Sequence, residues 1–134
     1  MGIVNENLCY DFKDRLGNGS SGTIVFQGSF NENPVAVKRM DSLNFEMVDR
    51  EISLLKLGES HENIVKYFCT HKNEEFCYIA IEICDFDASK YFPQMGDPEP
   101  RELLKQLRSE FQVKDILKQT TEGIKYLHNI QISK

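Results

Sequence analysis

The fold of this chain is decided by the stretch Gly17-Asn18-Gly19-Ser20-Ser21-Gly22-Thr23-Ile24-Val25-Phe26. Its glycines have the spacing G-x-G-x-x-G, which occurs where a loop opens a helix against a pyrophosphate and also where a loop joins two strands. The residues after Gly22 are mostly β-branched or aromatic, and such residues favour a strand. We therefore predict a β-hairpin whose glycines let backbone amides approach phosphate oxygens. The loop alone leaves open a structural turn that holds no ligand.

A lysine on the next strand favours a phosphate-binding hairpin. The sequence Val35-Ala36-Val37-Lys38 is typical of a strand. Side chains alternate along a strand, so Ala36 and Lys38 face the same side. Ala36 is small enough to leave room for a flat ring, and Lys38 supplies a point charge to phosphates. The glycine loop and the lysine together predict a nucleotide site and weigh against a lysine that merely faces solvent.

An acidic partner for Lys38 is expected on the helix that follows. Apolar residues recur there at roughly helical spacing, namely Phe45, Val48, Ile52, Leu55 and Leu57. Glu51 lies beside this apolar stripe and can point inward to Lys38, while Glu46 is the competing candidate. A lysine inside a cleft needs such a partner, because an uncompensated buried charge is costly. We therefore predict Lys38 and Glu51 as the catalytic pair.

The order of elements predicts an α+β fold. The expected strands are residues 10–16, 23–30, 35–40, 64–71 and 75–84. The helix between the third and fourth strands is expected to begin at Asp41 or Ser42 and to stop at Gly58. These elements give a five-stranded antiparallel sheet with one helix.

The predicted domain organisation has three parts. Residues 1–9 form a lead, and residues 10–84 form the nucleotide-binding lobe. Residues 85–134 form a connector and the start of a second lobe. That last part is expected to hold one or two helical turns at 88–92, a proline-rich loop at 93–101 and a long amphipathic helix at 113–127.

Composition and charge restrict the function further. The net charge of -5 weighs against a nucleic-acid surface, which needs clustered Lys and Arg. No apolar run reaches about 18 residues, so no membrane span is expected in this segment. The four cysteines have no C-x-x-C spacing. No metal site is therefore predicted. Cys69, Cys77 and Cys84 lie in apolar, strand-like contexts, which favours reduced, buried thiols.

These motifs together resemble the amino-terminal lobe of eukaryotic protein kinases. The resemblance rests on the glycine loop, on Lys38 and Glu51, and on the strand that ends Ile81-Glu82-Ile83-Cys84. Leu-Gly-x-Gly-Ser-Ser-Gly-Thr-Ile-Val-Phe, Pro-Val-Ala-Val-Lys-Arg-Met and Tyr-Ile-Ala-Ile-Glu-Ile-Cys are similar to the inositol-requiring kinase and endoribonuclease sensors of the unfolded-protein response. The resemblance covers about residues 10 to 132.

The resemblance implies an adenine site and a phosphate site. Ile81 is similar to the gatekeeper behind the adenine, and the backbones of Glu82 and Cys84 would bond the adenine edge. The residues expected to sandwich the ring are Leu16, Ile24, Ala36 and Val65. The residues expected to cover the phosphates are Gly17, Gly19, Ser20, Ser21 and Gly22. Asp85 or Asp87 could reach the ribose.

The resemblance also implies a serine/threonine protein kinase that binds ATP and ADP. Magnesium would be held only with the second lobe, and another kinase protomer is a candidate partner. The implied location is cytoplasmic, on the cytosolic face of the endoplasmic reticulum for a full-length member. The 134 residues stop before a His-Arg-Asp loop and a D-F-G motif, so this polypeptide alone is predicted to be inactive. The alternatives are a non-catalytic, kinase-like regulatory module and a degenerate, truncated reading frame.

Overall fold

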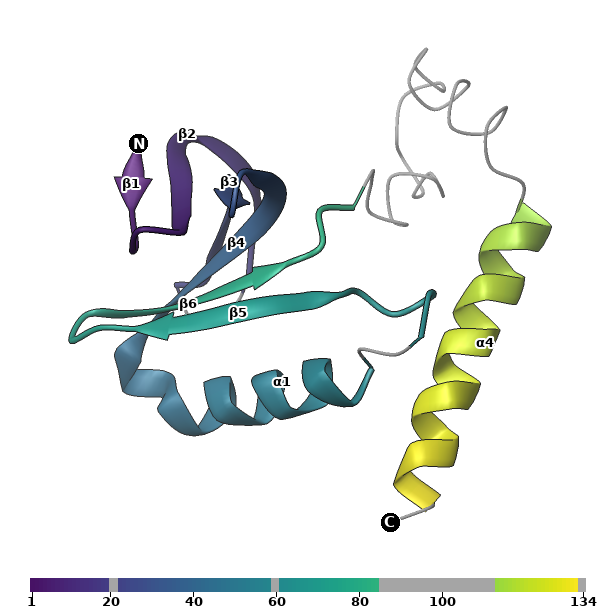
Figure 1. Cartoon of the computed structure of the whole chain (residues 1–134). Helices are drawn as coiled ribbons and strands as arrows, with labels where there is room; N and C mark the ends of the chain where they lie inside the picture. The colour runs from purple at the N-terminus through teal and green to yellow at the C-terminus, as the bar shows by residue number, and fades with distance from the viewer. Residues whose placement is uncertain (20–21, 59–60, 85–112, 133–134) are drawn as a thin grey trace, which may run out of the picture. The chain divides into compact units, whose positions relative to one another are not determined.

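The computed structural model describes residues 1–19, 22–58, 61–84 and 113–132 (Figure 1). The chain divides into two compact units, Met1–Ile83 and Cys84–Lys134. The expected connector at 85–87, helical turns at 88–92 and loop at 93–101 lie outside the described residues. The three-part domain organisation therefore stays a prediction.

The first unit is a six-stranded antiparallel sheet with one α-helix. Its strands are β1 (Gly2–Ile3), β2 (Leu8–Asn18), β3 (Ile24–Phe30), β4 (Asn33–Asp41), β5 (Tyr67–Lys72) and β6 (Phe76–Ile81). They lie in the order β1-β2-β3-β4-β6-β5, and each neighbouring pair is antiparallel. The helix α1 (Phe45–Leu57) follows the 3-10 turn η1 (Ser42–Asn44) and runs along β5 and β6 in Figure 1. The predicted α+β fold is confirmed.

The sixth strand, β1, corrects the sequence analysis, which expected residues 1–9 only to lead into the sheet. A tight turn produces this strand. The backbone N–H groups of Val4 and Asn5 donate to the carbonyl of Leu8 at 2.9 and 3.2 Å. The side-chain oxygen of Asn5 accepts from the N–H groups of Asn7 and Leu8 at 2.8 and 2.9 Å. Asparagine side chains often stabilise a reversal of the chain in this way. Here the reversal lets β2 pair antiparallel with β1.

The ends of the strands differ from the prediction because pairing across the sheet sets them. The expected turn at 31–34 is shorter, since β4 already begins at Asn33. Its two central residues, Asn31 and Glu32, have φ of 48° and 68°. A two-residue turn with positive φ at both positions matches the twist of a hairpin. At the same end of the sheet, where Ile81 pairs with Ala36 near the start of β4, β6 stops at Ile81 and does not extend to residue 84.

Two apolar clusters fill the two faces of the sheet. The first cluster consists of Leu8, Tyr10, Phe26, Val35, Val37, Tyr78 and Ala80. The second cluster includes a residue of α1 and consists of Met40, Val48, Cys77 and Ile79. Because side chains alternate along β4, Ala36 and Lys38 lie on the same face as Met40. We call this side of the sheet the α1 face.

Local contacts determine where α1 begins and ends. The Ser42 hydroxyl donates to the carbonyl of Glu74 at 2.8 Å, which anchors η1 to the turn between β5 and β6. After the helix, a Cβ on Gly58 would overlap the Cγ2 atom of Ile64. Only glycine fits at this close approach, and α1 ends at Leu57, directly before it, as the sequence predicted.

The second unit contains the helix α4 (Val113–Ile132). It continues past the predicted end at residue 127, since no glycine or proline follows there to stop it. The hydroxyls of Thr120 and Thr121 donate to the carbonyls of Ile116 and Leu117, both at 2.7 Å, so they are satisfied within the helix. Among the described residues, no helix combines the length and apolarity that crossing a membrane requires.

Candidate nucleotide-binding site

The glycine hairpin joins β2 to β3 and leaves space beside its backbone. Gly17 pairs with Val25, and the N–H of Gly19 donates to the carbonyl of Thr23 at 2.8 Å, which closes the loop. A Cβ at Gly17 or Gly22 would meet no atom within 4 Å. Gly22 has φ of 79°, which glycine adopts without strain. In the described part of the loop, the backbone at Gly17 and Gly22 is therefore open, and its contact with phosphate stays a prediction.

Lys38 and Glu51, which the sequence predicted as a pair, are in contact. The Nζ of Lys38 donates to the Oε1 of Glu51. The side chains are 25% and 34% exposed, so water screens their attraction less than it would at an open surface. The competing candidate, Glu46, is exposed at the start of α1. The contact is a fact of the structure, whereas the catalytic role of both residues stays a prediction.

Two periodic patterns bring this pair together. The alternation of β4 places Lys38 on the α1 face, opposite Ile79 of β6. On the helix, Val48 is buried in the second cluster, and Ile52 packs against it. We call Val48 and Ile52 the buried ridge of α1. Each helical residue is rotated by about 100° from the previous one, so Glu51 lies at one margin of this ridge. The margin position lets the carboxylate reach β4 beside the helix.

Ala36 and Ile81 lie opposite each other in the sheet and share the α1 face. They form a register pair of β4 and β6, and Ala36 is only 5% exposed. Ile81 is half-buried and packs against the second cluster. Val65 is half-buried just before β5, and Leu16 on β2 is 42% exposed. A small residue beside a branched apolar one suits the flat face of a base.

The structure does not bring Ile24 beside Ala36. Ile24 pairs with Arg39 and packs against the first cluster. Arg39 is itself held by aromatic rings, with its guanidinium 4.6 Å from the ring centroid of Phe76 and 5.1 Å from that of Phe26. These cation–π contacts could not be anticipated from the sequence. The contact of Ile24 with a nucleotide ring therefore stays a prediction.

The segment predicted to meet the adenine edge is tied to the chain before β5. The N–H of Glu82 donates to the carbonyl of Lys66 at 2.8 Å, and the N–H of Lys66 donates to the Oε2 of Glu82 at 3.1 Å. An adenine contact at Glu82 would therefore use its carbonyl oxygen. Cys84 is exposed and belongs to the second unit. Ser20 and Ser21 lie outside the described residues.

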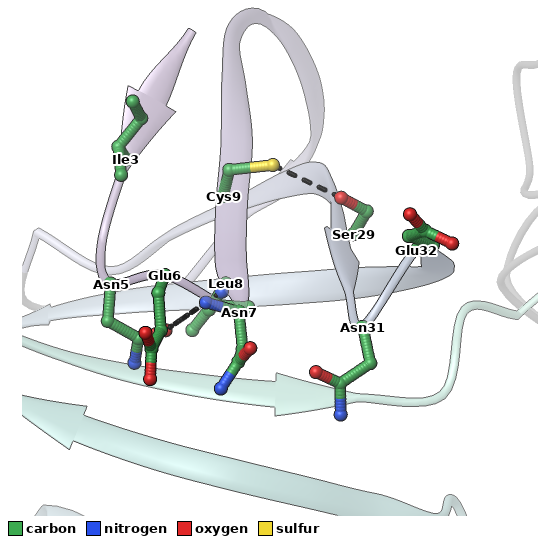
Figure 2. A pocket seen from close by; sticks show the side chains of 9 residues that line it. All are labelled: Ile3, Asn5, Glu6, Asn7, Leu8, Cys9, Ser29, Asn31 and Glu32. Atoms are coloured by element: carbon green, nitrogen blue, oxygen red, sulfur yellow. Dashed lines mark hydrogen bonds between the residues drawn. The ribbon is translucent and has the colours of Figure 1, made fainter.

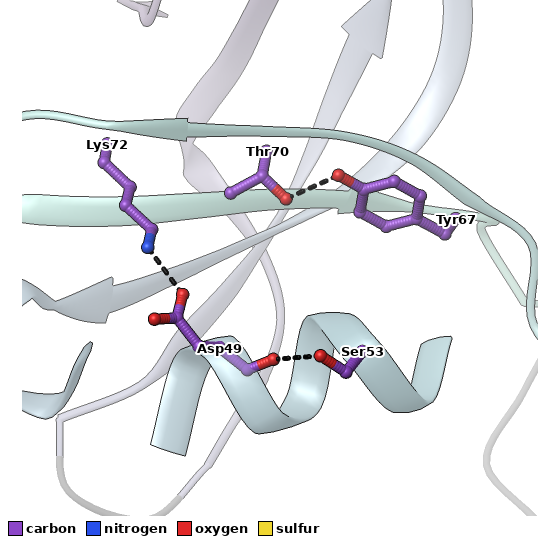
Figure 3. A network of polar contacts seen from close by, with 5 residues as sticks. All are labelled: Asp49, Ser53, Tyr67, Thr70 and Lys72. Atoms are coloured by element: carbon purple, nitrogen blue, oxygen red, sulfur yellow. Dashed lines mark hydrogen bonds and ion pairs between the residues drawn. The ribbon is translucent and has the colours of Figure 1, made fainter. Parts of the chain in front are cut away.

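A second ion pair, which the sequence analysis missed, also joins α1 to the sheet. The Nζ of Lys72 donates to the Oδ1 of Asp49 at 2.6 Å (Figure 3). This hydrogen bond to Asp49 raises the pKa of Lys72. The carbonyl of Asp49 in turn accepts from the hydroxyl of Ser53 at 2.9 Å. No local pattern marked this pair, because before folding Asp49 and Lys72 each resemble any solvated side chain.

A shallow pocket of about 720 Å³ lies between the β1–β2 connection and the β3–β4 turn (Figure 2). Its lining consists of Ile3, Asn5, Glu6, Asn7, Leu8, Cys9, Ser29, Asn31 and Glu32. Within it, the Sγ of Cys9 lies 3.1 Å from the Oγ of Ser29. None of the predicted nucleotide-binding residues lines this pocket, so it is distinct from the site at Lys38.

The cysteines are all free thiols, as expected, but they differ in burial. Cys77 is buried, Cys9 and Cys69 are half-buried, and Cys84 is exposed, which corrects the prediction that it is buried. Burial raises the pKa of Cys69 and of Cys77. In the part of the chain that the structure describes, no group of three or more His, Cys, Asp or Glu side chains could hold a metal ion.

Fold and site together define the amino-terminal lobe of a protein kinase. Its parts are the antiparallel sheet, the glycine hairpin and a strand lysine paired with a helix glutamate. The chain belongs to the protein kinase domain family, whose model matches residues 10–133. The resemblance found in the sequence is therefore confirmed.

Relatives of the chain include proteins named serine/threonine-protein kinase/endoribonuclease. Serine/threonine-protein kinase/endoribonuclease IRE2 of Homo sapiens is 36% identical over 133 residues, which is 96% of this chain and 13% of that protein. The corresponding protein ire-1 of Caenorhabditis elegans is 34% identical over 129 residues, 96% of this chain and 12% of its own length. In Aspergillus fumigatus, ireA is 35% identical over 117 residues, 87% of this chain and 10% of its own length. The chain thus spans only 10–13% of the length of these relatives.

Proposed function

We propose that the chain binds ATP between the glycine hairpin and the Lys38–Glu51 pair, as the nucleotide-holding part of a serine/threonine protein kinase. The observation that carries this proposal is the ion pair itself. The contact of Lys38 with Glu51 and the open glycine hairpin on the same sheet support a role for this lysine in binding phosphate oxygens. Without Glu51, the long lysine side chain would sample many rotamers, and ordering it would weaken binding.

Each part of the site has a role in this proposal. The open backbone at Gly17 and Gly22 approaches the phosphates, and Lys38 neutralises part of their charge. Ala36 and Ile81 form an apolar wall against the base, with further ring contacts proposed for Leu16, Ile24 and Val65. The carbonyl of Glu82 and the backbone of Cys84 bond the adenine edge. Bound ATP would supply the phosphoryl group.

Phosphoryl transfer needs more than these residues. It requires metal ions on the phosphates and an oriented acceptor hydroxyl. Residues 1–134 contain no His-Arg-Asp and no Asp-Phe-Gly sequence. We therefore propose that this polypeptide binds ATP and ADP without transferring phosphate, and that magnesium is held only together with second-lobe residues beyond these.

The cellular role is proposed from the names of the relatives. A protein of Schizosaccharomyces pombe that is 32% identical over 131 residues is named a sensor for unfolded proteins in the ER. We propose that the chain serves the same response, on the cytosolic face of the endoplasmic reticulum, with a second kinase protomer as its partner. The names of the relatives support this proposal, and the described site supports only the nucleotide part of it.

Calorimetric titration of the purified 134-residue chain with ATP tests the proposal. Lys38→Met should weaken ATP binding by about tenfold or more, because a charge-assisted bond to phosphate contributes about 1.5–3 kcal/mol. The matched control is Lys13→Met, which removes the same charge from an exposed position on β2. Equal affinities of the wild type and Lys38→Met would refute the site. A wild type that binds no ATP would favour a non-catalytic module that binds a protein partner.

A further inference from the structure

Asp49 and Lys72 have no part in the proposed function, yet their ion pair lies close to the pair that does. Asp49 is two positions before Glu51 on α1, and Lys72 is the last residue of β5. The two ion pairs therefore join the same helix to the sheet at two different strands, β4 through Lys38 and β5 through Lys72. Figure 3 shows the contact on the β5 side.

The two carboxylates lie on opposite margins of the buried ridge of α1. Successive residues of a helix are rotated by about 100°, so Asp49 and Glu51 point roughly 160° apart around the axis. Val48 and Ile52, which face the second cluster, point between these two directions. The ridge thus contacts the sheet, and one carboxylate extends on each side of it.

The lysines match this arrangement from the side of the sheet. The strand order β4-β6-β5 places Lys38 and Lys72 on either side of β6. Across the sheet, Ile79 pairs with Lys38 and Cys77 pairs with Lys72. Val48 belongs to the same cluster as Cys77 and Ile79. The helix therefore lies over β6 and is linked to the strand on each side by one ion pair.

We propose that Asp49 and Lys72 are positioning residues that fix the rotation of α1 and so keep Glu51 directed at Lys38. Rotation about the helix axis moves one carboxylate toward the sheet and the other away from it. Rotation in either sense therefore lengthens one of the two ion pairs, and the two pairs together resist both senses. Loss of the Asp49–Lys72 pair should therefore weaken ATP binding. This consequence rests on the proposed nucleotide function.

The test is the rate at which an amine-reactive reagent, acetic anhydride, modifies Lys38 in the full 134-residue chain. Mass spectrometry reads each lysine separately. Asp49→Asn removes the charge and keeps the shape, and we expect Lys38 to be modified about two- to fivefold faster, the range that an exposed ion pair allows. Lys72 should also be modified faster. The matched control is Glu46→Gln, which removes an exposed carboxylate from the same helix and should leave both rates unchanged.

A charge swap separates positioning from a general loss of stability. The double variant Asp49→Lys with Lys72→Glu should return the Lys38 rate and the Kd for ATP toward wild-type values, whereas each single variant raises both. Circular dichroism verifies that all variants are folded. An unchanged Lys38 rate in Asp49→Asn would overturn the proposal. If the wild type binds no ATP, the proposed function fails, and the labelling rates still decide whether this pair positions the helix.

Discussion

The two side chains of the Lys38–Glu51 pair should be energetically coupled. Lys38→Met removes the cation and leaves the Glu51 carboxylate, 34% exposed, without its partner. Glu51→Gln removes the anion and leaves Lys38, 25% exposed, in the same position. Each single variant should therefore lower the free energy of unfolding. The double variant should lower it by less than the sum, because the second replacement removes a charge that has already lost its partner.

The exposure of the two side chains sets the magnitude. Exposed ion pairs contribute about 0.2–1 kcal/mol, and removing one partner of a fully buried pair costs about 3–5 kcal/mol. A pair that is one quarter to one third exposed lies between these limits, and solvent screening places it nearer the lower one. We expect each single variant to cost about 1–2 kcal/mol, with a coupling of about 1 kcal/mol.

Urea denaturation followed by circular dichroism measures this coupling. The chain has no tryptophan, and urea is uncharged, so it does not screen the ion pair. The control cycle combines Lys38→Met with Glu46→Gln. It should be additive within about 0.5 kcal/mol, since Glu46 does not contact Lys38. If the Lys38 and Glu51 effects were equally additive, the ion pair would have no energetic role and our assignment of Glu51 would be wrong.

Three further predictions concern the scaffold of the site. Gly28→Ala should destabilise the sheet by about 1–3 kcal/mol, since a Cβ there would overlap the Cys9 carbonyl oxygen, and a lowered Tm would show it. Glu32→Gly should raise the free energy of unfolding by roughly 0.5–1 kcal/mol, because glycine adopts the φ of 68° at this position without the strain that a Cβ causes. A Glu32→Gly variant no more stable than Glu32→Ala would contradict this. Burial raises the pKa of the Cys77 thiol above its ordinary 9.0, so the unfolded thiol ionises before the folded one as pH rises. Stability should therefore be full below pH 9.0 and fall above it, and Cys77→Ala should flatten that fall in denaturation curves.

The positions of residues that follow from a repeating local pattern could be predicted from the sequence. The β-branched residues after Gly22 indicated a hairpin, and the alternation of β4 placed Ala36 and Lys38 on one face. The apolar stripe of α1 then selected Glu51 over Glu46. The side chains of a strand repeat every two residues and those of a helix about every 3.6 residues. Tertiary packing did not override these two periods at the residues named.

Features that depend on contacts between distant segments could not be predicted in this way. The pairing of Ile24 with Arg39 follows from the register of β3 and β4, which no local pattern specifies. The Asp49–Lys72 pair joins two exposed charges, and before folding each resembles any solvated side chain. The strand β1 depends on a turn formed by one asparagine. A single residue is too short a signal to predict a strand in residues 1–9, which show no strand-like pattern.

The short length of β1 has a consequence for how molecules of this protein meet. β1 pairs with β2 only through Gly2 and Ile3, so beyond Tyr10 the outer edge of β2 has no strand partner among the described residues. Unpaired strand edges are templates on which another molecule can add a strand. Here the edge is irregular between Tyr10 and Arg15, and its side chains include exposed charges of both signs at residues 13–15. The segment that leads into the glycine hairpin therefore also discourages the sheet from growing into a fibre.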